Sequence, residues 1–208
     1  MMTDEDLLRE DDYQAAAFHP KSIILTLMLM GVGSLFVALS AAYVYNRVQH
    51  PEIPPIKLPT LFILNTLILL ASSYTLIQAK KAYRADDTEG YKKNLLFTLL
   101  LSILFFIAQF IAWQILFAND INFQHSNTAS YLIIISITHL VHVIAGIPFL
   151  AVFYYNARKR MVEPVSVLVY FSDPAKKLNL RLLTVYWHFL DALWIYLVVF
   201  FGLSYFIQ

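Results

Sequence analysis

The sequence contains no cysteine, which excludes disulfide bonds, zinc sites built on thiolates and iron–sulfur clusters. Charged residues are scarce as well: they make up 14% of the chain, whereas about 25% is usual in soluble domains. The formal net charge of only +1 argues against a nucleic-acid partner. No segment has the sequence pattern of a phosphate loop, a dinucleotide-binding site or an activated nucleophile. These absences point away from the common soluble enzymes and toward a membrane protein.

Long apolar runs are what the chain has instead, since hydrophobic residues make up 59% of it. A helix needs about 20 mostly apolar residues to cross a bilayer, and five runs satisfy that requirement. The predicted fold is therefore all-α, with five transmembrane helices in a single membrane domain, 22–208, that follows an acidic tail, 1–21. The predicted spans cover about 22–45, 58–79, 94–118, 129–155 and 182–206.

The basic residues predict the orientation of these spans. Thirteen of the 15 Lys and Arg residues lie in the N-terminal tail, in the 80–93 loop and in the 156–181 loop. Only Arg47 and Lys57 lie on the other side. The positive-inside rule then places the N-terminus in the cytoplasm and the C-terminus outside. The 156–181 loop is long for a bundle connection, and its apolar part is expected to lie flat at the membrane interface.

The last run, 182–206, contains the one Asp, Glu, Lys or Arg residue found within any predicted span. This residue is Asp191. Helical spacing places Trp187 and Trp194 on the same stripe as Asp191, with His188 beside the carboxylate at i, i+3. An ionisable group at such a depth nearly always faces protein or trapped water. We therefore expect this face of the helix to be buried against a partner.

The fourth span supplies candidates for that partner. His139, His142 and Gly146 follow one another at positions 0, 3 and 7 of one helical face. The fourth and fifth spans are antiparallel, and the rise of the helix brings these histidines to about the depth of His188 and Asp191. The sequence thus predicts a buried cluster in which imidazole and indole donors surround the carboxylate, oriented toward the bundle or toward lipid headgroups.

The other spans also carry residues that predict contacts between helices. Asn65 and Ser72 in the second span, and Gln109 and Trp113 in the third, are expected to form interhelical hydrogen bonds. Such bonds are worth about 0.5–2 kcal/mol each in a membrane. Small residues allow close approach of a neighbouring helix. In the first span they form a stripe of Gly31, Ser34, Ala38 and Ala41.

Three interpretations of the polar cluster compete. A metal or haem site has suitable ligand types at i, i+3 spacing, but di-iron bundles require several carboxylates and membrane hydroxylases require more histidines. A proton path lacks a second carboxylate within the spans. The third interpretation is a set of hydrogen bonds that lock helices and lipid in place, and the balance of residues favours it. It assigns no catalytic, cofactor-binding or metal-binding residue to this chain.

The same residues carry a resemblance to a known family. Residues 186–194, Tyr-Trp-His-Phe-Leu-Asp-Ala-Leu-Trp, resemble the signature of subunit III of the haem–copper oxidases, the terminal oxidases of respiration. The resemblance continues in the correct order through all five spans, as in the five-span bacterial form. The other matching segments are Ala41-Ala42-Tyr43, Leu64-Asn65-Thr66 with Ser72-Ser73, Phe106-x-x-Gln109 with Trp113, and His139-x-x-His142-Val143-x-x-Gly146.

The resemblance implies a non-catalytic subunit of a proton-pumping cytochrome c oxidase in a bacterial inner membrane. Haem and copper would reside in partner subunit I, and further copper in subunit II, with no cofactor in this chain. Phospholipid would be bound, and further respiratory subunits are an additional class of partner. The matching site residues would serve packing and lipid binding. A quinol oxidase subunit is the alternative within the family; a small transporter and a His-ligated membrane metalloenzyme are the alternatives from other classes.

Two positions depart from the family pattern. Val32 and Ala112 stand where the family usually has Glu. Without these carboxylates, a role of the chain as a proton conduit through the membrane is not expected.

Overall fold

The computed structural model describes residues 19–50, 60–118 and 127–206. These residues form five long helices and one short helix, and no strand occurs within these ranges. The prediction of an all-α protein with five membrane-spanning helices is confirmed, because each of the five long helices is long and apolar enough to cross a membrane. Apart from 19–21, the predicted acidic tail lies outside the described residues. The helices are α2 (Pro20–Gln49), α3 (Leu61–Arg84), α4 (Thr88–Ala118), α5 (Asn127–Arg160), α6 (Pro164–Ser172) and α7 (Pro174–Phe206).

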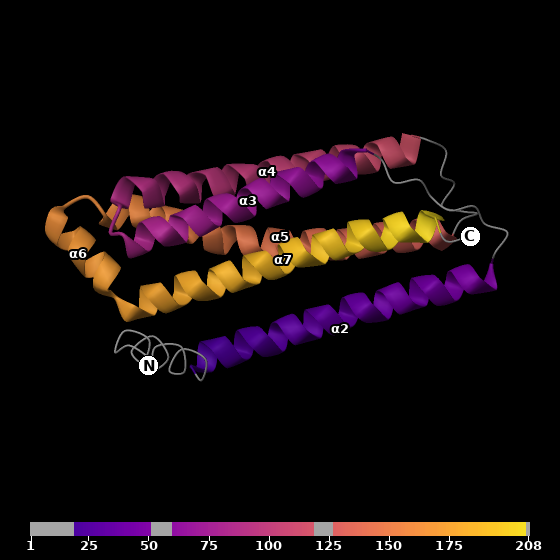
Figure 1. Ribbon diagram of the computed structural model, residues 1–208, viewed down its shortest axis with the longest axis horizontal. Coiled ribbons are helices and arrows are strands. Elements are labelled where there is room, and N and C mark those ends of the chain that lie inside the picture. Colours follow the sequence, from indigo (N-terminus) through magenta and orange to yellow (C-terminus); the bar gives the residue numbers. More distant parts are fainter. Residues whose placement is uncertain (1–18, 51–59, 119–126, 207–208) are drawn as a thin grey trace, which may run out of the picture.

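The long helices lie side by side along the long axis of the molecule (Figure 1). α3 and α4 form the most extensive helix pair, and α7 packs against α2, α3 and α5. α2 contacts only α5 and α7 among these elements, apart from minor contacts, so most of its surface faces outward. The short helix α6 crosses one end of the bundle and links α5 to α7 (Figure 1).

The 156–181 segment differs from the long loop expected from the sequence. α5 continues to Arg160, α6 occupies most of the middle, and α7 already begins at Pro174. A proline in the first turn favours a helix start, because its fixed backbone angle suits the helix and its missing N–H is not needed there. Pro164 and Pro174 both occupy such positions. The basic residues of 158–160 and 176–181 thus belong to the ends of α5 and α7, and not to a loop.

The α3–α4 connection is a tight turn. Asp86 adopts a positive φ of 53°, a conformation that Asp tolerates better than most residues. The carboxylate of Asp87 then accepts a hydrogen bond from the backbone N–H of Gly90, at 3.0 Å. This bond satisfies one of the free N–H groups at the start of α4. The short turn holds α3 and α4 antiparallel along their length.

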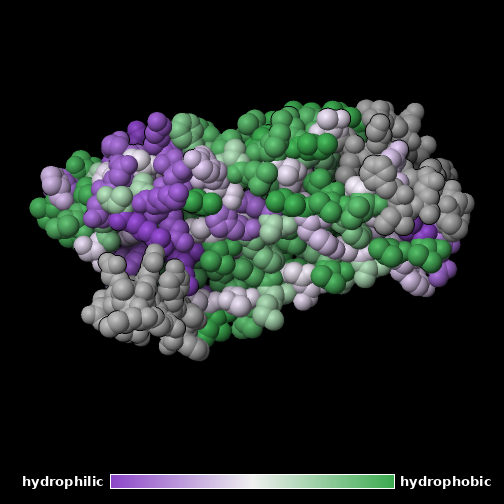
Figure 2. Space-filling view, in the orientation of Figure 1, coloured by the Kyte–Doolittle hydropathy of each residue, from purple (hydrophilic) through white to green (hydrophobic). Residues whose placement is uncertain are grey.

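The outer surface of the bundle has the polarity of a membrane protein. On the face seen in Figure 2, apolar residues cover the middle, and hydrophilic residues gather at the end that carries α6. The interior contains two apolar clusters, one around Phe105 and Trp194, the other around Tyr91 and Trp187. The polar residues of the candidate site lie among these clusters.

Candidate functional site: polar contacts between the helices

Asp191 and His188 lie where α7 contacts α3. Its side chain is only 8% exposed. Its Oδ2 atom lies 3.8 Å from Nδ1 of His188, one turn earlier in α7. The same Nδ1 atom of His188 lies 2.7 Å from the hydroxyl oxygen of Ser73 on α3. The contact of the imidazole with Ser73 joins the two helices at this level, whereas the Asp191 Oδ2 atom is buried beside the imidazole without a hydrogen-bond partner among the described residues.

This trio does not have the geometry of a hydrolytic triad. In a Ser-His-Asp triad, the serine and the carboxylate bind opposite nitrogens of the imidazole, so that a proton can pass between them. Here both Ser73 and Asp191 approach the same nitrogen of His188. In the part of the chain that the structure describes, no group of three or more His, Cys, Asp or Glu side chains could hold a metal ion.

The indole groups of α7 bind hydroxyl groups on α3. The sequence had predicted that they would surround Asp191, and this prediction was wrong. Trp187 donates its Nε1–H to the hydroxyl oxygen of Ser72 at 3.2 Å, and Trp194 donates to that of Thr66 at 3.1 Å. The two tryptophans are seven residues apart, which is about 10 Å along the helix axis. Each indole therefore meets a residue of the antiparallel helix at its own level.

The histidines of α5 also lie apart from the carboxylate. His139 is fully buried, and neither of its ring nitrogens has a hydrogen-bond partner. Its ring packs against aromatic residues, with its centroid 5.2 Å from that of Trp194 and 6.2 Å from that of Phe105. His142 donates its Nδ1–H to the backbone carbonyl of Thr138 at 2.7 Å, since a carbonyl can only accept. The predicted single cluster is therefore several separate contacts.

Gly146 allows α5 and α7 to approach closely. A Cβ atom added at this position would lie 2.8 Å from Cε1 of Tyr186 and 3.0 Å from Cζ3 of Trp187. The Tyr186 hydroxyl also donates to the backbone carbonyl of His142 at 2.7 Å. The structure thus explains why a glycine suits this position of the motif: any side chain there would displace the two aromatic rings.

The polar residues predicted in α3 and α4 form interhelical contacts. Asn65 donates to the side-chain oxygen of Gln109 at 2.7 Å, and both residues are fully buried. Trp113 donates its Nε1–H to the hydroxyl of Ser136 on α5 at 3.1 Å. These two bonds connect α3 to α4 and α4 to α5, so the hydrogen bonds of the site link α3, α4, α5 and α7.

Two partners in these contacts, Thr66 and Ser136, were not predicted from the sequence to form hydrogen bonds with a neighbouring helix. Thr66 and Ser136 accept the indole hydrogen bonds, while each also donates to a backbone carbonyl of its own helix, Phe62 and Ile133 respectively. A hydroxyl that satisfies itself within its helix gives no sign in the sequence that it also binds a neighbour. The one signal in the sequence for such an interhelical bond was the position of the hydroxyl residue on the polar face of an otherwise apolar run.

The two positions that lack the family's usual Glu are buried and apolar. Val32 is 8% exposed and Ala112 is fully buried, and both belong to the cluster around Trp194. The interior of the described helices therefore offers no second carboxylate along the bundle at these positions.

The chain is similar in sequence to known proteins of one family. The family described as cytochrome c oxidase subunit III matches residues 36–206. The chain is 27% identical over 179 residues to cytochrome c oxidase subunit 3 of Synechocystis sp., a match that covers 84% of this chain and 72% of that protein. It is 26% identical over 187 residues to the protein of the same name from Thermostichus vulcanus, covering 86% of each chain. The subunit 3 protein of Corynebacterium diphtheriae is 28% identical over 144 residues, covering 69% of this chain and 63% of that protein.

Proposed function

The chain belongs to the cytochrome c oxidase subunit III family, and we propose that it is the non-catalytic third subunit of a proton-pumping respiratory oxidase. In this role it stabilises the catalytic subunit and holds phospholipid at the interface. The observation that carries the proposal is that five hydrogen bonds between side chains of the site connect one helix to another: those of Asn65, Ser73, Trp113, Trp187 and Trp194. Such an arrangement fixes helix positions.

The proposed partners are subunits I and II of the oxidase. Haem and copper would be held by subunit I, and further copper by subunit II. The chain is a multi-pass membrane protein, and its place in a bacterial inner membrane, with the N-terminus in the cytoplasm, is part of the proposal. It is supported by the basic residues that gather at the α6 end of the bundle.

The electron donor is proposed to be cytochrome c. The relatives from Synechocystis and Thermostichus are both named cytochrome c oxidase subunit 3, which favours this donor over quinol. The donor would bind elsewhere in the complex.

Two surface features support docking against another subunit or lipid. The small residues of α2 face outward, whereas Val32, Phe36, Ser40 and Tyr43 form its buried face. A stripe of small residues allows a helix of another chain to approach closely. The side chain of His188 is 35% exposed beside Ser73, so we assign lipid contact to the outer face of α3 and α7 at this level. His139, being fully buried, would contribute only packing.

A tag on this chain tests the proposal. Purification from membranes in a mild detergent is expected to recover a partner that bears haem and copper, detected by optical spectra and metal analysis. Recovery of the chain in folded form without such a partner would overturn the subunit assignment. As the matched control, the chain separated from all partners should show no haem bands. Haem bands or stoichiometric iron in that preparation would overturn its non-catalytic role.

A further inference from the structure

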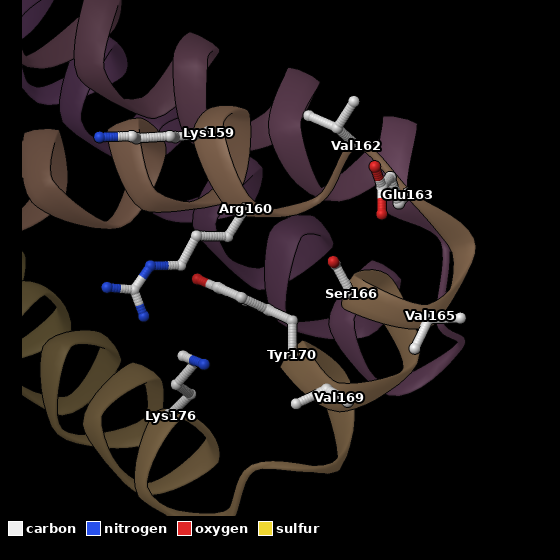
Figure 3. A pocket seen from close by; sticks show the side chains of 9 residues that line it. All are labelled: Lys159, Arg160, Val162, Glu163, Val165, Ser166, Val169, Tyr170 and Lys176. Atoms are coloured by element: carbon white, nitrogen blue, oxygen red, sulfur yellow. The ribbon is translucent and has the colours of Figure 1, made fainter.

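A pocket of about 530 Å³ lies at the end of the bundle, away from the contacts around Asp191. It is bounded by the last turn of α5, by α6 and by the start of α7, as Figure 3 shows. Its lining combines three basic side chains, one carboxylate and several valines. This combination of charge and apolar surface is the reason to consider a ligand.

Two of the basic groups converge with a hydroxyl. In Figure 3 the Arg160 guanidinium, the Tyr170 hydroxyl and the Lys176 ammonium group point toward a common space, while Lys159 points away from it and Glu163 lies on the far side of Tyr170. Among the residues that the structure describes, no carboxylate forms an ion pair with Arg160. A guanidinium without such a partner among these residues, beside a second cation, favours an oxyanion such as a phosphate.

Lys176 and Tyr170 are held in place by their neighbours. The Lys176 ammonium group lies 3.0 Å from Oδ2 of Asp173 and 4.4 Å from the centroid of the Tyr170 ring. The Tyr170 side chain is buried, and this burial raises the pKa of its phenol, so the hydroxyl keeps its proton at neutral pH. The site therefore presents one cation held by its neighbours, Lys176, together with the exposed guanidinium of Arg160 and one hydroxyl donor. Asp173 neutralises only part of the positive charge.

The rim of the pocket is apolar and exposed. Val165, Leu168 and Val169 lie on one face of α6 at i, i+3 and i+4, with exposed fractions of 74%, 67% and 63%. Val162, just before the helix, is 74% exposed as well. α6 crosses the end of a bundle whose other helices run along its long axis (Figure 1). This is the arrangement of a short helix that lies in the membrane interface with its apolar side toward the acyl chains.

We propose that the pocket binds the phosphate headgroup of an anionic phospholipid, with Arg160 and Lys176 on the phosphate and the acyl chains along the valines of α6. Inorganic phosphate shares the headgroup chemistry, but it would leave the apolar rim exposed to water. The site is separate from the lipid contact proposed near His188. It does not depend on the assignment of the chain to an oxidase.

A photo-crosslinkable phosphatidylglycerol tests the site on the full chain purified with the subunits that accompany it. Cross-links are mapped by mass spectrometry, and we expect them within residues 160–176. Each basic side chain near an anionic lipid surface contributes about a factor of five in affinity. The double variant R160Q/K176Q should therefore label about 30-fold more weakly at the same lipid concentration. A phosphatidylcholine probe with the same acyl chains should label this segment weakly in both proteins.

The control variant is K81Q/R84Q, which removes the same two types of charge from exposed positions on α3. It should label like the parent protein. Equal labelling of R160Q/K176Q and the parent, or an equal loss in the control, would overturn the proposal. V165S/V169S should also weaken labelling. If labelling by phosphatidylglycerol is unchanged in V165S/V169S and is abolished by inorganic phosphate at equal concentration, the pocket is a site for free phosphate, which would overturn the lipid assignment.

Discussion

The indole N–H of Trp187 donates to the hydroxyl of Ser72 across 3.2 Å, and both side chains are buried. Trp194 makes a second contact of this type with Thr66, two turns further along the same pair of helices. α3 and α7 are thus joined at two levels about 10 Å apart. Sliding or rotating one helix against the other would break both bonds and would move Trp187 away from Gly146.

A double-mutant cycle on the first of these contacts should show coupling. Ser72→Ala and Trp187→Phe each remove one side of the hydrogen bond, and the coupling energy is expected to be about 0.6 kcal/mol, the average for such bonds in membranes. The measurement is the free energy of unfolding in detergent titrations. Thr66→Ala combined with Trp187→Phe is the matched control, because these two side chains do not bind each other, and its effects should add. Additivity of the Ser72–Trp187 pair would contradict the contact.

Gly146→Ala should destabilise the protein by about 1–3 kcal/mol, the usual cost of overpacking. The new Cβ atom would lie within 2.8 Å of the Tyr186 ring, so the ring or the helix must move. Thermal unfolding in detergent is the measurement. Gly202→Ala serves as control, since no atom lies within 4 Å of the Cβ position there. The substitution at Gly202 should be neutral or stabilising, because alanine favours a helix by about 1 kcal/mol over glycine. Equal effects at the two glycines would show that α5 and α7 do not meet at Gly146.

Asp191→Asn should weaken the attachment of lipid or of the chain to its complex more than it lowers the initial rate of oxygen reduction. The substitution keeps the shape of the side chain but replaces its carboxyl group, which lies beside His188, with an amide that cannot ionise. Oxygen uptake per assembled complex, measured at once and again after incubation in detergent, separates the two effects. Asp86→Asn is the control, because Asp86 is exposed and asparagine tolerates its positive φ. Immediate loss of turnover in an intact complex would assign a direct role in the reaction to Asp191.

Removing one member of the Asn65–Gln109 pair should cost more than removing both. Asn65→Leu leaves the buried Gln109 amide without a partner, and such an unsatisfied group costs about 1–3 kcal/mol. In the parent protein Oδ1 of Asn65 and Nε2 of Gln109 already lack a partner, so the pair is only half satisfied. N65L/Q109L should therefore unfold at a denaturant concentration equal to or above that of the parent. A double variant less stable than N65L would show that the pair contributes more than its single bond.

The sequence predicted the spans well because the signal for a membrane helix is local. A run of about 20 apolar residues must satisfy its backbone groups internally, and in lipid a helix does this without help from other segments. The prediction of a long loop at 156–181 was wrong, because helices occupy most of this segment. Pro174 starts a helix whose first turns are polar, and neither the apolar run nor its length shows how far a helix continues beyond the membrane.

The candidate site could be predicted only as a set of residues. His188 and Asp191 are neighbours on one helix, so spacing alone placed them together. The same reasoning grouped His139 with them by depth, but His139 instead packs against Trp194 in an aromatic environment. Depth gives one coordinate of a side chain; its partner also depends on how each helix is rotated and which helix lies beside it.

The sequence by itself determined that this is a five-helix membrane protein and which residues carry its buried polarity, since both follow from the hydropathy of neighbouring residues and from helical period. Only the tertiary structure decided which hydroxyl each tryptophan of α7 binds, why a side chain at Gly146 would displace two aromatic rings, and that α5, α6 and α7 border a basic pocket. These features depend on the distances between segments far apart in the chain, and such distances are set by the packing of all the helices together.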